Sequence, residues 1–174
     1  MVLRRIAWVG LALGGATAAV APFVDWFRVT AVADGRTRVG SLAATAYGTT
    51  TTAFGVLALF VAFLLLRERS GWRWWPALGA GAMFFVLVTG LRGGLDPVGS
   101  GKAALSEVAA LDLAGVEPGT VDDLGFRIRL ATEFNEGRLA AESLVGGWVA
   151  AAGGALGLVG SALLVVRAAR GRHP

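Results

Sequence analysis

Four long apolar runs divide the chain, and the segments between and beside them carry all of its charged residues. The runs cover residues 6–24, 47–66, 74–91 and 144–166. A helix needs about 20 apolar residues to cross a hydrocarbon core about 30 Å thick. Each run therefore predicts a transmembrane helix.

The first run could be part of a signal peptide, and the second run begins with polar residues, so both need closer inspection. Arg4 and Arg5 precede the first run, as positive residues do in a signal peptide. That run is 19 residues long and contains Pro22-Phe23 near its end, a poor cleavage site, which favours a retained helix over a cleaved signal. In the second run, residues 49–52 are all threonine. Threonine hydroxyls can bond to backbone carbonyls one turn earlier, so this stretch can still enter a membrane.

Residues 25–46, between the first two runs, are rich in β-branched and aromatic residues on both sides of Asp34-Gly35. The Asp-Gly pair is favoured in tight turns whose residues need positive φ. This pattern predicts a β-hairpin. An irregular loop is the alternative.

The polar segment at residues 92–143 opens and closes with helical patterns. Residues 102–111 have helical spacing, and Ser100 is a candidate N-cap. From Glu133 onward the pattern is helical again and leads directly into the fourth apolar run.

Between these helical patterns lies a stretch with the alternation of a strand. Phe126, Ile128 and Leu130 alternate with Arg127 and Arg129. We expect this strand to pair with the hairpin, because a third strand with an apolar face stabilises a hairpin that is marginal alone.

Together these elements predict an all-α membrane protein forming one domain over residues 1–174. Its four transmembrane helices would carry a small extracytoplasmic cap, built from residues 25–46 and 92–143, that contains the β-hairpin and a short helix.

Basic residues indicate on which side of the membrane each segment lies, because short cytoplasmic loops collect Lys and Arg. The N-terminus, the turn between the second and third runs and the C-terminal tail hold eight arginines and one acidic residue, whereas the other segments hold eight basic and eleven acidic residues. We therefore expect a multi-pass protein of the cell membrane with both termini in the cytoplasm. In that turn Trp72, Trp74 and Trp75 are expected to lie in the headgroup layer as anchors.

Small residues recur at four-residue spacing in the first and fourth runs, a spacing that lets helix backbones approach closely in lipid. We expect these two helices to pack through Gly10, Gly14, Gly153, Gly157 and Ser161. The alternative is that small residues are simply abundant, since 26 of the 174 residues are glycine.

The composition argues against several kinds of chemistry. The chain has no cysteine and a single histidine, His173, which removes thiolate, disulfide and histidine-based metal sites. Residues 96–104 resemble a phosphate-binding loop but lack its first glycine and the Ser or Thr after its lysine. Asp122-Asp123 with Glu117 could bind a hard cation, although a solvated acidic turn is the simpler interpretation. We expect no enzyme activity, cofactor or metal.

Five arginines form a potential basic face on the cap: Arg28, Arg36, Arg38, Arg127 and Arg129. Anionic lipid headgroups or an acidic partner would be its targets. The alternative is a set of solvated charges that protects the edge of the sheet. The net charge of +4 does not predict nucleic acid as a partner, because the basic excess lies at the flanks of the apolar runs.

Three stretches carry a resemblance to a known family: WFRVTAVADG after the first run, RERSGWRWW between the second and third runs, and the Gly/Ala-rich last run that ends in arginines. In this order they resemble small actinobacterial four-span proteins, in particular the tryptophan-operon-associated membrane protein family. The resemblance implies an integral membrane protein whose role is undefined. The long acidic segment and the RHP ending depart from it.

These observations favour a protein that acts by contact rather than by turnover. No ionisable side chain lies deep in any run, whereas ion-coupled carriers normally place Asp, Glu, Arg or His there. We expect a non-enzymatic accessory or scaffold subunit of a larger membrane complex, with membrane lipids and other integral membrane subunits as partners. The alternative is a transport or lipid-handling component that binds an apolar ligand.

Overall fold

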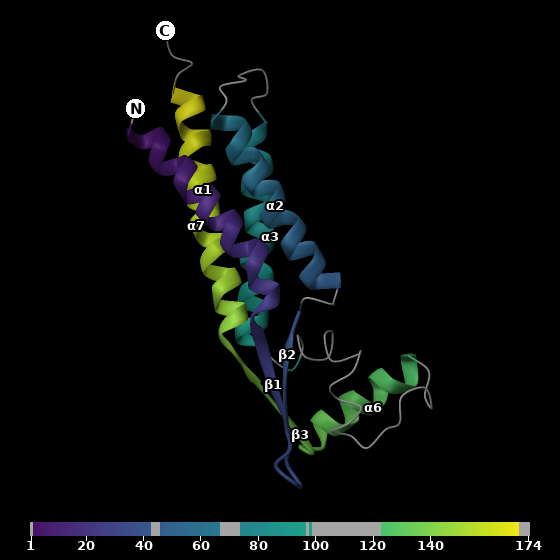
Figure 1. Ribbon diagram of the computed structural model, residues 1–174. Helices are drawn as coiled ribbons and strands as arrows, with labels where there is room; N and C mark the ends of the chain where they lie inside the picture. Colours follow the sequence, from purple (N-terminus) through teal and green to yellow (C-terminus); the bar gives the residue numbers. More distant parts are fainter. Residues whose placement is uncertain (1, 43–45, 67–73, 97, 99–122, 171–174) are drawn as a thin grey trace.

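A computed structural model describes residues 2–42, 46–66, 74–96, 98 and 123–170 (Figure 1). The four apolar runs form its four long helices, each long and apolar enough to cross a membrane. These helices are α1 (Val2–Val20), α2 (Ala46–Leu66), α3 (Trp75–Leu95) and α7 (Val145–Arg170). α3 extends past the end of its predicted run and therefore includes Arg92.

The long helices form a bundle in which consecutive members run in opposite directions. α7 packs against α1 and α3, and α2 packs against the same two helices from the other side. α1 and α3 lie on a diagonal and touch little. Both termini therefore lie at one end of the bundle, and the strands lie at the other (Figure 1).

Two hydroxyls of the threonine run at the start of α2 donate to backbone carbonyls, and one of these bonds has the predicted geometry. The Thr51 hydroxyl donates to the carbonyl of Tyr47, one turn earlier, at 2.8 Å. The Thr52 hydroxyl donates to the Ala19 carbonyl of α1 at 3.4 Å. These bonds let a polar stretch begin an otherwise apolar helix.

A three-stranded antiparallel sheet extends from the bundle. It consists of β1 (Asp25–Ala31), β2 (Thr37–Ser41) and β3 (Leu139–Ser143), in the order β2-β1-β3. The predicted hairpin is confirmed, with residues 32–36 as its loop. Gly35 closes this loop at φ 70°, a conformation that glycine adopts without steric cost.

The predicted strand at residues 126–130 is wrong, because these residues lie in the helix α6 (Asp123–Asn135). Leu130 is 1% exposed, and Phe134, four residues later, packs against the same core. Ile128 is 60% exposed, although a strand would place it on the same face as Leu130. The apolar residues of this segment fit both the two-residue period of a strand and the 3.6-residue period of a helix. Burial of Leu130 and Phe134 on one face favours the helix.

The predicted helix from Glu133 into the fourth run is also wrong in part, because β3 lies between α6 and α7. Gly137 turns the chain at φ 69°, and β3 then pairs with β1 as the third strand. Arg138, in the turn between α6 and β3, has its Nε 3.1 Å from Glu133 Oε2. The predicted helix at residues 102–111 lies outside the described residues.

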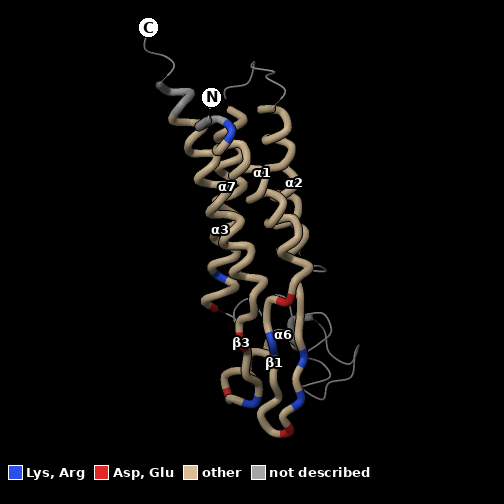
Figure 2. Tube along the Cα trace, turned by 60° about the vertical axis from the view of Figure 1, so that its left-hand side comes forward, with Lys and Arg blue, Asp and Glu red and all other residues tan. Residues whose placement is uncertain are grey.

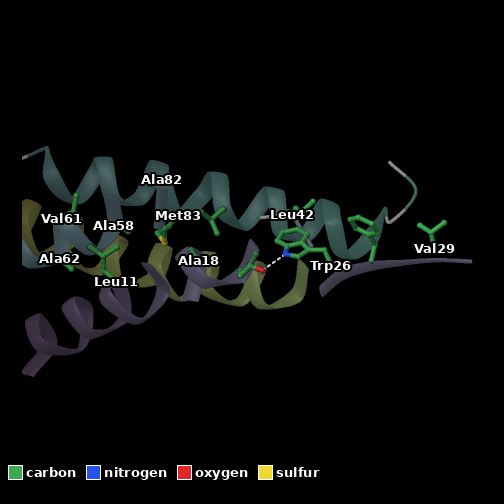
Figure 3. Close-up of a cluster of buried hydrophobic side chains, with 14 of the residues drawn as sticks. Leu11, Ala18, Trp26, Val29, Leu42, Ala58, Val61, Ala62, Ala82 and Met83 are labelled. Carbon is green, nitrogen blue, oxygen red and sulfur yellow. Dashed lines mark hydrogen bonds between the residues drawn. The ribbon is translucent and has the colours of Figure 1, made fainter. Parts of the chain in front are cut away.

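Buried side chains form one continuous cluster that runs from the bundle into the sheet (Figure 3). It includes Leu11, Val61 and Met83 between the helices, Trp26 at the junction, and Val29, Leu130 and Leu139 in the cap. The cap and the bundle therefore share a core.

Candidate interaction surfaces

The junction between the bundle and the sheet is built around Trp26, which is 1% exposed. Its Nε1 donates to the carbonyl of Ala21 at 2.7 Å (Figure 3). A Cβ added at Gly93 of α3 would lie 2.6 Å from the indole, and one added at Gly146 of α7 would lie 2.3 Å from it. The indole therefore occupies a notch that exists only because both helices have glycine there.

Backbone hydrogen bonds on both sides of this indole tie the sheet to the bundle. The Leu144 N–H, just before α7, donates to the Trp26 carbonyl at 2.8 Å. The Leu42 N–H, just after β2, donates to the Pro22 carbonyl at 3.1 Å. The residues that follow β2 and β3 are thus hydrogen-bonded to the segment that leads from α1 into β1.

Four of the five predicted packing residues lie where α1 and α7 cross. A Cβ added at Gly14 would lie 2.5 Å from the backbone nitrogen of Gly157 and 2.6 Å from the carbonyl oxygen of Gly153. At Gly10 the nearest atoms are 3.5 Å away, on Gly160 and Leu156. The two backbones are therefore in direct contact at Gly14. Near Gly10 the contact is made by Gly160 of α7, where an added Cβ would lie 2.6 Å from the Ala7 carbonyl oxygen.

Gly157 and Ser161 also contribute to the α3 side of α7. A Cβ added at Gly157 would lie 2.4 Å from the Met83 sulfur. Ser161 is fully buried, and its Oγ lies 3.1 Å from the Cβ position of Gly79. That Oγ has no hydrogen-bond partner among the described residues. The predicted ridge therefore serves two helix contacts.

The five predicted arginines do not lie together on one face of the sheet. In the register of β1 and β2, Arg28 is opposite Val39 and Val29 is opposite Arg38. Neighbouring residues of a strand point to opposite faces, so Arg28 and Arg38 do too. Arg127 and Arg129 belong to α6 rather than to a strand.

Two of the predicted arginines, one in β1 and one in the hairpin loop, form local ion pairs. Arg28 Nη1 lies 3.7 Å from Oε2 of Glu142, the residue opposite it on β3. Arg36 pairs with Asp34 in the hairpin loop, where its backbone N–H also donates to Asp34 Oδ1 at 3.1 Å. This N–H, followed by the guanidinium, lowers the pKa of the Asp34 carboxyl below its ordinary value of 3.8.

Two of the three predicted tryptophan anchors belong to the described residues and lie at the terminal end of the bundle. Trp74 is 77% exposed. Trp75 is half-buried at the start of α3, with its ring edge-on to Phe60 at a centroid distance of 6.1 Å. Trp72 lies outside the described residues.

A groove that sequence reasoning did not find runs along the outer side of the α2–α3 contact. Its volume is about 510 Å³, and all the side chains that line it are apolar. They are Phe54 and Leu57 of α2 and Ala77, Leu78, Ala82, Phe84, Phe85 and Val88 of α3, with Gly81 between them. Within the described ranges, no group of three or more His, Cys, Asp or Glu residues could hold a metal ion.

No protein-family model, curated protein or solved structure matches this chain. The candidate surfaces therefore have to be interpreted from their own geometry: a sheet joined to one end of the bundle by backbone hydrogen bonds and Trp26, and an apolar groove on the side of the bundle.

Proposed function

We propose that the protein is a multi-pass protein of the cell membrane that acts as a non-enzymatic accessory or scaffold subunit of a larger membrane complex. Four helices of sufficient length support the membrane location. The excess of arginine at the terminal end of the bundle supports cytoplasmic termini and an extracytoplasmic sheet. Membership of the tryptophan-operon-associated membrane protein family is part of the same proposal and rests on sequence resemblance.

One observation carries the proposed role: the sheet is joined rigidly to the helices. Trp26 is inserted between Gly93 and Gly146, and backbone bonds hold the strands on both sides of it. A partner that contacts the sheet would therefore meet a surface held in a fixed orientation to the membrane. Charged groups on such a surface orient a partner and fix its register more than they add affinity.

Purification from native membranes in a mild detergent, with a tag at the C-terminus, tests this role. We expect a second integral membrane protein to co-purify at a constant molar ratio. Replacing Arg28, Arg36 and Arg38 together by Gln should weaken that association, and more strongly at low salt, where charges are less screened. Arg129→Gln is a control for the loss of one exposed arginine of the cap outside the sheet, and single replacements of Arg28, Arg36 and Arg38 are compared with it. Recovery of the protein alone, under several mild conditions, would contradict the proposal.

The α2–α3 groove favours a second candidate function, that of a transport or lipid-handling component. Its lining is apolar throughout and it opens toward the surroundings of the bundle. Purification of the protein with a specific lipid and without a protein partner would favour this function over the first.

A further inference from the structure

The strand β2 forms an open edge of the sheet. The central strand β1 has β2 on one side and β3 on the other, so both outer strands are edges. Four of the five residues of β2 are exposed, whereas three of the five residues of β3 are buried or half-buried. The β2 edge is therefore the more accessible of the two.

The register shows which backbone groups of β2 point away from β1. In an antiparallel pair, hydrogen-bonded and non-hydrogen-bonded residue pairs alternate along the strands. The Ala31 N–H donates to the Arg36 carbonyl at 2.8 Å. The backbone of Arg38, two residues later and opposite Val29, therefore also faces β1. The N–H and C=O groups of Thr37 and Val39 point outward.

The β3 side of the central strand follows the same alternation. The Val32 N–H donates to the Arg138 carbonyl at 2.9 Å, and the Leu144 N–H donates to the Trp26 carbonyl at 2.8 Å. The even-numbered residues of β1 therefore bond toward β3, which leaves its odd-numbered residues, such as Ala31, for β2.

The outward groups of Thr37 and Val39 have no strand beside them. In the part of the chain that the structure describes, neither residue is hydrogen-bonded to a residue outside β1. Thr37 is exposed, and Val39 is 47% exposed. Unpaired N–H and C=O groups along an edge are a template for a further strand. An extended segment can therefore bind here through its backbone, as in β-strand addition.

The direction of the strands limits which chain can supply that segment. β1 and β2 run along the axis of the bundle (Figure 1), and copies in one membrane share one orientation. An antiparallel β2–β2 pair between two copies would point their bundles in opposite directions. A parallel pair related by a two-fold axis would turn equivalent side chains to opposite faces, which breaks its register. A two-fold dimer through this edge is thus incompatible with one membrane, and β3 of a second copy offers the less accessible edge.

From this arrangement we propose that the β2 edge binds an extended segment of an extracytoplasmic partner protein, which adds a fourth strand to the sheet. Neighbouring residues of a strand point to opposite faces. The added strand therefore needs an apolar side chain beside Val39 on one face and an acidic one beside Arg38 on the other. Both Val39 and Arg38 are exposed. The proposal rests on the accessory role and names the contact through which the partner is held.

Hydrogen exchange of the complex co-purified from native membranes tests the backbone contact. We expect the amides of Thr37 and Val39 to exchange about tenfold more slowly in the complex than in the purified chain alone, because each gains a hydrogen bond. The Arg38 amide, which faces β1, is the internal control and should change less. Unchanged exchange at Thr37 and Val39 in an intact complex would overturn this proposal and leave the accessory role standing. Protection of both amides in the chain alone would overturn it in favour of a second copy, and the absence of any partner would overturn both proposals.

Val39→Pro removes one outward N–H and leaves the ladder to β1 intact, a place where an edge strand tolerates proline. It should reduce the amount of recovered partner about tenfold, and the Tm of the purified variant checks its fold. Val39→Thr is the matched control, since threonine keeps the N–H and the β-branched shape, and it should retain the partner. Arg38→Glu should weaken the association, more strongly at low salt. Equal recovery of partner with folded Val39→Pro and Val39→Thr would overturn the proposal; if Val39→Pro does not fold, the exchange measurement decides.

Discussion

Trp26 determines how the sheet meets the bundle. It is a large side chain that contacts α3 and α7 at once, at Gly93 and Gly146. Its N–H is bonded to the Ala21 carbonyl, which also accepts the Val24 N–H at 3.2 Å. Removal of the indole N–H would therefore leave that carbonyl with one donor, whereas removal of the whole ring would leave a void between two helices.

We expect Trp26→Phe and Trp26→Ala to destabilise the protein to different extents. Loss of the hydrogen bond alone should lower the free energy of unfolding by about 1 kcal/mol. Truncation to alanine should lower it by about 3–5 kcal/mol, because a large cavity remains. Unfolding in detergent, followed by circular dichroism, measures both changes. Trp74→Ala is the control, since that ring is 77% exposed; an equal loss at Trp74 would contradict the assigned role of Trp26.

The hairpin loop contains the residue for which a pH effect is expected. Because the pKa of Asp34 is lowered in the folded protein, its contribution to stability is fully present above the ordinary value of 3.8 and is lost as the pH falls through the folded pKa. Arg36→Gln should raise the pKa of Asp34 only in part, since the backbone N–H of residue 36 is the larger cause. NMR titration of the Asp34 carboxyl carbon measures this shift. A return of the full 3.8 in that variant would show that the guanidinium dominates.

Two pairs of glycines in the sequence indicate where Trp26 packs, although we did not predict the site from them. Gly93-Gly94 and Gly146-Gly147 lie at the ends of two helices that meet the sheet. Paired glycines at the same level of two helices leave room for a large ring, and Trp26 is the ring that the first strand brings there. The faces of the arginines could not be predicted, because they depend on the register between strands.

Among helices, the glycines divide into classes according to what a side chain would meet. Gly14 faces the backbone of α7, which cannot move without separating the helices, and Gly157 faces the flexible side chain of Met83. Gly81 faces open space. The same substitution should therefore have graded effects at these positions.

We expect Gly14→Ala to lower the free energy of unfolding by about 1–3 kcal/mol, the usual cost of overpacking. Gly157→Ala should cost less, because Met83 can change rotamer. Gly81→Ala should be neutral or stabilising by up to about 1 kcal/mol, the difference in helix propensity. Unfolding titrations of the three variants in one detergent give the order directly. An effect at Gly81 as large as that at Gly14 would show that the α2–α3 groove is closed in solution.

The four long helices and the hairpin could be predicted because their patterns are local. The third strand could not, since β3 reads Leu-Ala-Ala-Glu-Ser and has few β-branched or aromatic residues. It is ordered by its partner: Leu139 is opposite Ala31 and Ala141 is opposite Val29 on the central strand. Conversely, residues 126–130 alternate like a strand, but Leu130 and Phe134 bury one face of a helix. Sheet pairing depends on contacts across more than a hundred residues, which local periodicity does not contain.

Over the whole molecule, charge is distributed along the axis of the bundle. Figure 2 shows the described acidic residues gathered at the sheet end and the long middle of the helices without charge. In the sequence, three arginine-rich segments flank the other ends of the four helices: the N-terminus, the turn between α2 and α3, and the C-terminal tail. A membrane around the uncharged middle would have a basic cytoplasmic side and an acidic outer side.

The orientation of the chain in a membrane tests the account most directly, because the extracytoplasmic position of the cap and the proposed partner surface both depend on it. A reporter enzyme that is active only outside the cytoplasm can be fused after Pro174, or inserted after Gly35 in the exposed hairpin loop. We predict no activity from the fusion at Pro174 and strong activity from the insertion at Gly35, with equal amounts of both proteins in the membrane fraction. Activity at Pro174 with none at Gly35, or recovery of both proteins from the soluble fraction, would contradict the account.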